Sequence, residues 1–205
     1  MMLYNFLSPN GVRVDIFMAE KKIEIPTRKI DLLAHANRDP AFTGINSLQQ
    51  VPVLQLDDGR HLCESIAICR YLETLHPEPP LFDKDALDSA FVEMWMRLME
   101  FTTFAAVSDI ALHGLPIFSD RIEQNAESAQ SCRRKLERQF EWFDREISDG
   151  RPFVAGDRFT MADIVGMSTL LAMAFLKIEI AADLAHAGRW AERVRSRPSF
   201  PSLKW

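Results

Sequence analysis

The sequence has few cysteines and no cluster of metal-binding residues. Its three cysteines, Cys63, Cys69 and Cys132, form no Cys-x-x-Cys pair, which argues against a disulfide framework and suits a reducing compartment. The histidines lie far apart and show no metal-ligand spacing; they are His35, His61, His76, His113 and His186. We therefore expect neither structural disulfides nor a bound metal ion.

Long hydrophobic runs are also missing. The longest nearly apolar run, residues 164–176, has 13 residues, whereas a membrane-spanning helix needs about 20. Residues 1–7 lack the basic stretch, the apolar stretch and the cleavage site of a secretory signal. We predict a cytoplasmic protein that does not associate with membranes.

Positive charge is not in excess. The 24 Lys and Arg residues against 29 Asp and Glu residues give a net charge of −5, so the basic face of a nucleic-acid-binding protein is not expected. An apolar share of 47% and a charged share of 26% are typical of a globular protein. The length of 205 residues allows one large or two small domains.

A proline cluster divides the chain into two halves that differ in their predicted secondary structure. Three prolines within four residues follow His76, and proline stops a helix because it has no N–H to donate. Before the cluster, strand and helix patterns alternate, and after it the pattern is helical. We predict a first domain over residues 1–76, a linker over 77–84 and a second domain over 85–205.

The first half predicts a small sheet covered by helices. We expect helices after residue 11 and over 65–75, and strands over residues 2–7, 27–31, 53–56 and 60–63. The last two strands are joined through an Asp-Gly pair that suits a tight turn. This order is typical of the thioredoxin-like fold, so the fold class is α/β followed by all-α.

Two apolar stripes of helical period run through the second half, and we predict that both are core. The first consists of Leu87, Phe91, Met94, Trp95, Leu98, Phe101 and Ala105. The second consists of Ile122, Ala126, Ala129, Leu136, Phe140, Phe143 and Ile147. Cys132 falls on the second stripe and is expected to be a buried, small hydrophobic residue. Thr160 to Asp163 fits a helix capping box, which makes Asp163 a cap rather than a catalytic acid.

Three short signals in the first half favour a ligand site. Ser8 ends the first strand just before a helix, where a hydroxyl and the helix dipole stabilise an anion such as a thiolate, or where the hydroxyl simply caps the helix. Val51-Pro52 precedes a strand, and a cis peptide bond there would present the Val51 backbone to an extended peptide.

The third signal is Glu64-Ser65, at a strand-to-helix turn. The Ser65 hydroxyl and the first backbone amides, from Ser65 to Ile68, suit a carboxylate, while Glu64 suits an ammonium group. Together the three signals describe a site for a small peptide that carries an α-amino acid end and a thiol.

At this point the sequence resembles the cytosolic glutathione transferases over nearly its whole length. The matching stretches of the first half are Leu7-Ser8, Val14, Ile16-Phe17, Asp31 to Leu33, Asn46 to Leu54 and Glu64 to Leu72. Those of the second half are Val92 to Trp95, Phe159 to Ile164 and Arg197 to Phe200. The resemblance implies a thioredoxin-like N-terminal domain, an all-helical C-terminal domain, glutathione as co-substrate and a homodimer.

The resemblance also implies roles for residues of the first turn. Ser8 stands where theta-like enzymes carry their activating serine, and Tyr4 lies inside the strand instead. Ser8-Pro9-Asn10 equally resembles the turn of nu-type members, which are associated with glutathione-dependent disulfide reduction, so Asn10 is a second catalytic candidate. No cysteine occupies the turn, which excludes a dithiol cycle on turn residues.

Further positions follow from the same resemblance. Arg38 stands where many members place a basic residue that reaches the glycine carboxylate of glutathione. Gln50 suits the peptide end through its side chain, and Val51 and Pro52 offer backbone. An electrophile would lie against Met99, Phe101 and Phe104 of the helical domain, unless these are plain core.

We therefore predict an enzyme of detoxification that conjugates the glutathione thiolate to an electrophilic small molecule. One alternative is reduction of a disulfide substrate. The other is a noncatalytic interaction module, since the same fold serves that role as well. Retention of Ser8, Val51-Pro52 and Glu64-Ser65 favours the enzyme.

Overall fold

The computed structural model describes residues 1–200, and residues 201–205 of the expected second domain lie outside the described residues. The described chain forms two compact units, Met1–Pro80 and Leu81–Phe200. Each unit is described by itself below.

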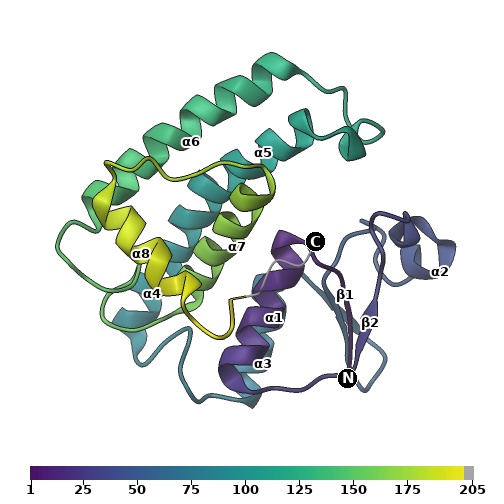
Figure 1. The fold of residues 1–205 in the computed structure, drawn as a ribbon. Coiled ribbons are helices and arrows are strands. Elements are labelled where there is room, and N and C mark those ends of the chain that lie inside the picture. Colours follow the sequence, from purple (N-terminus) through teal and green to yellow (C-terminus); the bar gives the residue numbers. More distant parts are fainter. Residues whose placement is uncertain (201–205) are drawn as a thin grey trace. The chain divides into compact units, whose positions relative to one another are not determined.

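The first unit is a mixed four-stranded sheet with helices on both of its faces (Figure 1). The strands, in the spatial order β2-β1-β3-β4, are β1 (Met2–Asn5), β2 (Thr27–Lys29), β3 (Val53–Gln55) and β4 (His61–Cys63). β1 pairs with β2 in parallel and with β3 antiparallel, and β4 is antiparallel to β3. The strands begin and end within a few residues of the ranges that the sequence predicts.

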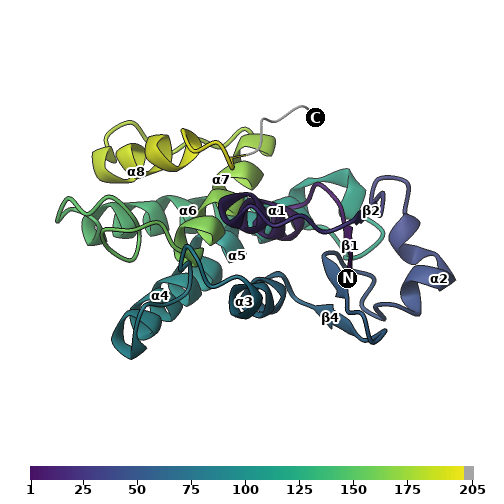
Figure 2. The ribbon, with the colours of Figure 1, turned by 90° about the horizontal axis from the view of Figure 1, so that it is seen from below.

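Helices α1 (Pro9–Lys21) and α3 (Ser65–Leu75) pack together on one face of this sheet, and the short α2 (Pro40–Thr43) lies beyond the other face (Figure 2). The predicted thioredoxin-like fold of the first half is confirmed. A short 3₁₀ helix, η1 (Ala36–Arg38), precedes α2.

Tyr4 belongs to the core of the first unit. It packs in a buried cluster with Ile30, Phe42 and Val53, and its hydroxyl donates to Gln55 Oε1 at 3.0 Å. The expectation that Tyr4 is a strand residue is confirmed, and its phenol already has a partner within the sheet.

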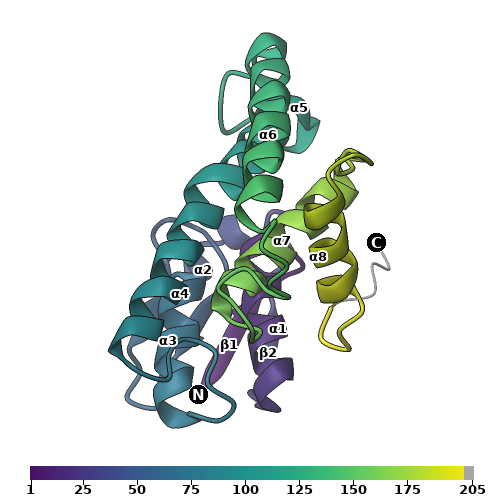
Figure 3. The ribbon, with the colours of Figure 1, turned by 90° about the vertical axis from the view of Figure 1, so that its left-hand side faces the viewer.

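The described part of the second unit is helical and contains no strand, which confirms the predicted all-helical domain (Figure 3). Its elements are α4 (Ala86–Met99), the π-helical turn η2 (Glu100–Phe104), α5 (Ala105–Gly114), the 3₁₀ turn η3 (Pro116–Phe118), α6 (Ala126–Glu146), α7 (Met161–Phe175) and α8 (Ala185–Arg195). Helix α7 is buried along most of its length, as its nearly apolar sequence predicts. None of the helices in residues 1–200 is long and apolar enough to cross a bilayer.

Asp163 is a structural cap, as predicted. Its Oδ2 accepts hydrogen bonds from the Thr160 amide at 3.0 Å and from the Thr160 hydroxyl at 3.2 Å. Its Oδ1 accepts from the Val154 amide and from Trp190 Nε1, both at 2.9 Å. Burial raises the pKa of Asp163, and the four hydrogen bonds oppose that rise. The carboxylate therefore joins the start of α7 to the preceding loop and to α8.

The first predicted core stripe is largely wrong. Leu87, Phe91, Met94 and Phe101 are 69%, 48%, 42% and 67% exposed, while Trp95 of the same stripe is 4% exposed. Helix α4 buries a different set, Val92, Trp95, Met96 and Met99. The helix has apolar residues on two faces, and periodicity alone does not say which face the rest of the unit covers.

The second stripe is confirmed over most of its length. Ala129, Leu136, Phe140, Phe143 and Ile147 are buried. Three members differ from the prediction: Ile122 lies before α6, Ala126 is exposed at its first turn, and Cys132 is half-buried with its Sγ 4.0 Å from Asp109 Oδ2. The beginning of α6 is therefore less covered than its middle, and Cys132 is not fully enclosed.

Candidate functional site

The strand register brings the three predicted signals to one end of the sheet. Tyr4 of β1 pairs with Val53 of β3, and Val53 pairs with Cys63 of β4. Because β3 runs antiparallel to both neighbours, the residues that follow β1, precede β3 and follow β4 share an edge. Ser8, Val51-Pro52 and Glu64-Ser65 are those residues.

Ser8 is the N-cap of α1. Its backbone is extended, with a φ of −137°, and its Oγ accepts a hydrogen bond from the Gly11 amide at 3.1 Å. The capping interpretation is thus confirmed. A hydroxyl that accepts through oxygen keeps its own hydrogen to donate, so capping and donation to a thiolate are compatible.

The first turn of α1 offers fewer free amides than its sequence suggests. Pro9 has no N–H, the Gly11 amide donates to Ser8 Oγ, and the Val12 amide donates to Ser8 O at 2.8 Å. Only the amide of Asn10, an exposed residue, is left in this turn. An anion at this helix end must depend on the Ser8 hydroxyl and Asn10 more than on a row of backbone donors.

Asn5 and Gly11 hold the Ser8 turn in place, a role that the sequence analysis missed. Asn5 is 4% exposed, and its Nδ2 donates to Gly11 O at 3.2 Å and to Asp15 Oδ1 at 2.8 Å. A Cβ atom on Gly11 would overlap Phe6 O and Asn5 Oδ1. A polar residue inside an otherwise apolar strand was the signal that could have identified Asn5.

The peptide bond between Val51 and Pro52 is cis, which confirms that expectation. The Val51 side chain is 7% exposed and packs in the Tyr4 cluster, so its backbone is what remains for a ligand. The preceding loop is held by Asn46 Nδ2, which donates to Gln50 O at 2.8 Å. The side chain of Gln50 is exposed at this position.

Arg38 is brought to the same loop by its neighbour. Asn37 Nδ2 donates to Gln49 O at 2.9 Å, and Asn37 is 1% exposed. This buried bond fixes η1 against the segment that leads into Pro52. Arg38, the next residue in η1, is exposed.

Glu64 and Ser65 begin α3. Glu64 has a φ of 71°, a left-handed backbone that is costly for a residue with a side chain and is concentrated at functional sites. Its side chain is exposed and makes no capping hydrogen bond, whereas Ser65 is 3% exposed. One detail of the prediction is wrong: the Ile68 amide donates to Glu64 O at 2.9 Å. Only the amides of residues 65–67 are left for a carboxylate, as helix geometry dictates.

The thiols closest in sequence to this turn have raised pKa values, which disfavours their reactive thiolate form. Burial and the adjacent Glu64 carboxylate raise the pKa of Cys63. Cys69 is fully buried in α3, which raises the pKa of its thiol much further. Neither thiol is therefore activated by its surroundings. Residues 1–200 contain no group of three or more His, Cys, Asp or Glu side chains that could hold a metal ion.

Comparisons with known proteins agree with this arrangement. Two family models match the chain: "Glutathione S-transferase, N-terminal domain" at residues 7–75 and "Glutathione S-transferase, C-terminal domain" at residues 94–198. Glutathione S-transferase 2 of Saccharomyces cerevisiae is 32% identical over 199 residues, which cover 95% of this chain and 85% of that protein. A probable maleylacetoacetate isomerase of Drosophila melanogaster is 30% identical over 157 residues, covering 74% and 60% of the two chains.

Solved structures give the same result. The crystal structure of Gtt2 from Saccharomyces cerevisiae has a TM-score of 0.90 at 31% identity and covers 98% of both chains. A transferase of class Gtt2 from Vibrio parahaemolyticus has a TM-score of 0.84 at 30% identity and covers 98% of this chain and 96% of that one.

Proposed function

Because this chain belongs to the glutathione S-transferase family, and is thus a transferase with glutathione as its co-substrate, we propose that it conjugates the glutathione thiolate to an electrophilic small molecule. The observation that carries the proposal is the strand register. It places Ser8, Val51-Pro52 and Glu64-Ser65 along one edge of the sheet.

Each part of glutathione has a protein group of matching chemistry at this edge of the sheet. The γ-glutamyl carboxylate accepts from the Ser65 hydroxyl and the first amides of α3, where the helix dipole favours negative charge. The exposed Glu64 carboxylate takes the ammonium group. The cysteinyl backbone pairs with the Val51 backbone beside Pro52, as an extended peptide pairs with a sheet edge. Arg38 and Gln50 serve the glycine end.

Ser8 activates the thiol. A thiol with a pKa of about 8.5 is only about 3% ionised at pH 7. Lowering that pKa by about two units requires roughly 2.7 kcal/mol in favour of the thiolate. One hydrogen bond to a charged group supplies about 1.5–3 kcal/mol. The hydrogen bond from the Gly11 amide polarises the Ser8 hydroxyl and strengthens its donation, and Asn10 is the second donor in reach of the same turn.

Disulfide reduction is the second candidate, favoured by Asn10. Its side chain is exposed in the first turn of α1, and its amide is the one left without a partner in that turn. In this reaction the activated glutathione thiolate attacks a substrate disulfide, and the mixed disulfide is then resolved by a second glutathione. Parallel assays with an aryl halide and with a small disulfide distinguish the two reactions.

Calorimetry with glutathione tests the binding site. We expect saturable binding to the full chain, and Ser65→Ala should weaken it by about 1–3 kcal/mol because the γ-glutamyl carboxylate loses a buried donor. Ser47→Ala, an exposed serine of the same unit outside the proposed contacts, is the control and should bind normally. An unchanged affinity in Ser65→Ala would remove Ser65 from the site, and no binding by the wild-type chain would favour the noncatalytic interaction module.

We also propose a homodimer that works in detoxification in the cytoplasm. Leu87, Phe91, Met94 and Phe101 form an exposed apolar stripe along α4 and η2. An apolar surface of this kind is typical of an interface between subunits. A second copy of the chain is the partner that the family resemblance suggests for it.

A further inference from the structure

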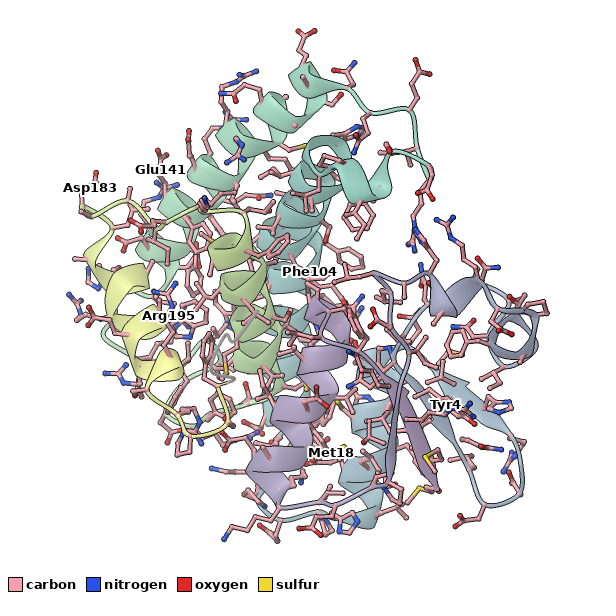
Figure 4. The ribbon with its side chains drawn as sticks, turned by 45° about the vertical axis from the view of Figure 1, so that its right-hand side comes forward. Tyr4, Met18, Phe104, Glu141, Asp183 and Arg195 are labelled. Atoms are coloured by element: carbon pink, nitrogen blue, oxygen red, sulfur yellow. The ribbon has the colours of Figure 1, made fainter. Side chains whose placement is uncertain are left out.

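A small cavity in the second unit is lined by arginine side chains. It has a volume of about 40 Å³ and lies between the end of α6, the loop that follows it and α8. Helices α6 and α8 lie side by side (Figures 1 and 4). Among its lining residues are Arg151, His186, Arg189, Trp190 and Arg193. None of them belongs to the proposed glutathione site.

Helix α8 directs three of these polar side chains to one face. His186, Arg189 and Arg193 are spaced i, i+3 and i+7, which places them on a single stripe of a helix. Arg189 Nη2 lies 2.7 Å from His186 Nδ1. The Nδ1 atom accepts this hydrogen bond in a neutral imidazole, which leaves the ring proton on Nε2 as a further donor.

Two of the arginines lack acidic partners. Arg193 donates from Nη1 to Pro152 O at 2.8 Å, and Arg189 has its contact with His186. Neither guanidinium forms an ion pair with any residue of the described chain. Each contact also uses one of the five N–H donors of a guanidinium, so both arginines keep donors to spare.

Arg151 adds a buried donor to the cavity wall. Its Nε atom is buried and makes no hydrogen bond, and Asp149 Oδ1 lies 3.6 Å from it. The guanidinium is held over the Trp95 ring at 4.6 Å and donates through Nη2 to Glu146 O. The ion pair with Asp149 is too long to be a hydrogen bond, so the Nε–H group still has a donor to offer to a ligand oxygen.

Nearby negative charge does not cancel this cluster. Asp149 forms an ion pair with Arg151, but its side chain is 59% exposed and therefore well solvated. Asp144 Oδ1 is occupied at the start of α8, where it accepts from the amides of His186 and Ala187 at 2.7 and 2.8 Å. Three arginines therefore line the cavity, and within the described chain only Arg151 of these is ion-paired with a carboxylate.

We propose that this cavity binds the oxygen atoms of a phosphate group. Guanidinium donors match the geometry of phosphate oxygens and pair with them in a bidentate manner. The volume of about 40 Å³ holds about three water molecules at 10–15 Å³ each, which suits a phosphate group and excludes a whole nucleotide. Any organic part of the ligand extends into solvent.

Inorganic phosphate is the probe that tests the proposal. The full chain is titrated at constant ionic strength while the arginine Nε–Hε signals are followed by NMR. Arg151, Arg189 and Arg193 should shift together and saturate, and the variant Arg189→Gln, Arg193→Gln should bind at least about 10-fold more weakly. Arg195→Gln is the matched control, because Arg195 is an exposed arginine of α8 (Figure 4) and is not among the residues that line the cavity.

Three results would overturn the proposal. The first is a linear response without saturation, which indicates ionic screening. The second is equal weakening by Arg195→Gln, which indicates a general effect of net charge. The third is saturation by acetate at the same concentration, since titration with acetate should leave the three signals largely unchanged. A phosphate monoester that binds more tightly than inorganic phosphate identifies an ester as the ligand, and the reverse identifies the free ion.

Discussion

At the scale of single residues, the Ser8 turn depends on contacts that are hidden from the ligand. The side chain of Asn5 and the missing side chain of Gly11 fix the position of the Ser8 hydroxyl. Neither residue is expected to touch glutathione. Both are positioning residues, and their effect on chemistry passes through Ser8.

Substitution of Gly11 tests this arrangement. Gly11→Ala adds a Cβ that overlaps Phe6 O and Asn5 Oδ1, and such overpacking costs about 1–3 kcal/mol. The free energy of unfolding in urea should fall by that amount, and the turnover of glutathione should fall because Ser8 moves. Gly44→Ala is the control, since a Cβ there would meet its nearest atoms at 3.6 Å. Normal stability and turnover in Gly11→Ala would contradict the positioning role.

At the scale of elements, the beginning of α7 depends on one buried carboxylate. Asp163 accepts four hydrogen bonds, from Thr160, Val154 and Trp190. The arrangement links the capping box to α8, which packs on α7.

Asp163→Asn should be destabilising although the two side chains have almost the same shape. The amide group replaces one accepting oxygen with a donor, so at least one buried N–H loses its partner, at about 1–3 kcal/mol each. Chemical denaturation should show a loss of about 2–3 kcal/mol. Asp183→Asn, at an exposed position of the same unit (Figure 4), should change stability by less than about 0.5 kcal/mol. A loss no larger than that of the control would mean that Asp163 is dispensable.

The order of the strands and of the two long helices in the first unit could be predicted from the sequence, because strand and helix periodicities and turn residues act locally, whereas the short α2 was not predicted. The helix 65–75 agrees with α3 at both ends, and Thr160 to Asp163 is the capping box that the pattern predicts. The pattern could not show which face of α4 is covered, since two faces carry apolar residues.

In the candidate site, too, some features could be predicted from the sequence and others could not. Glu64-Ser65 follows the local rules of a helix start, whereas the cis bond before Pro52 was expected from the thioredoxin-like fold, and the strand register aligns the two. The number of backbone amides left for a ligand in the first turn of α1 depends on where the Gly11 and Val12 N–H groups donate. The role of Asn5 depends on its hydrogen bond to Asp15, which lies ten residues further along the chain. Such pairings appear only once the chain is folded.

At the scale of the whole molecule, the exposed stripe on α4 and η2 is expected to be the surface of self-association. Light scattering should give about twice the 23.5 kDa of one chain. Phe91→Asp should shift the protein toward the monomer, because a buried charge without a partner is strongly unfavourable. Phe175→Asp is a matched control, since Phe175 is also 48% exposed but lies at the end of α7. Monomeric wild-type protein at micromolar concentration would contradict the dimer.

The central claim is that the Ser8 hydroxyl stabilises the glutathione thiolate. It is tested most directly by the pKa of the bound thiol, followed through thiolate absorbance in the wild-type protein, Ser8→Ala and Ser8→Thr. We expect Ser8→Ala to raise this pKa by about 1–2 units and to lower turnover about 10- to 100-fold at neutral pH, or roughly 1.4–2.7 kcal/mol. The affinity for glutathione should stay nearly unchanged, and Ser8→Thr should retain the low pKa because it keeps the hydroxyl. The same bound-thiol pKa in the wild-type protein and Ser8→Ala would show that Ser8 only caps α1.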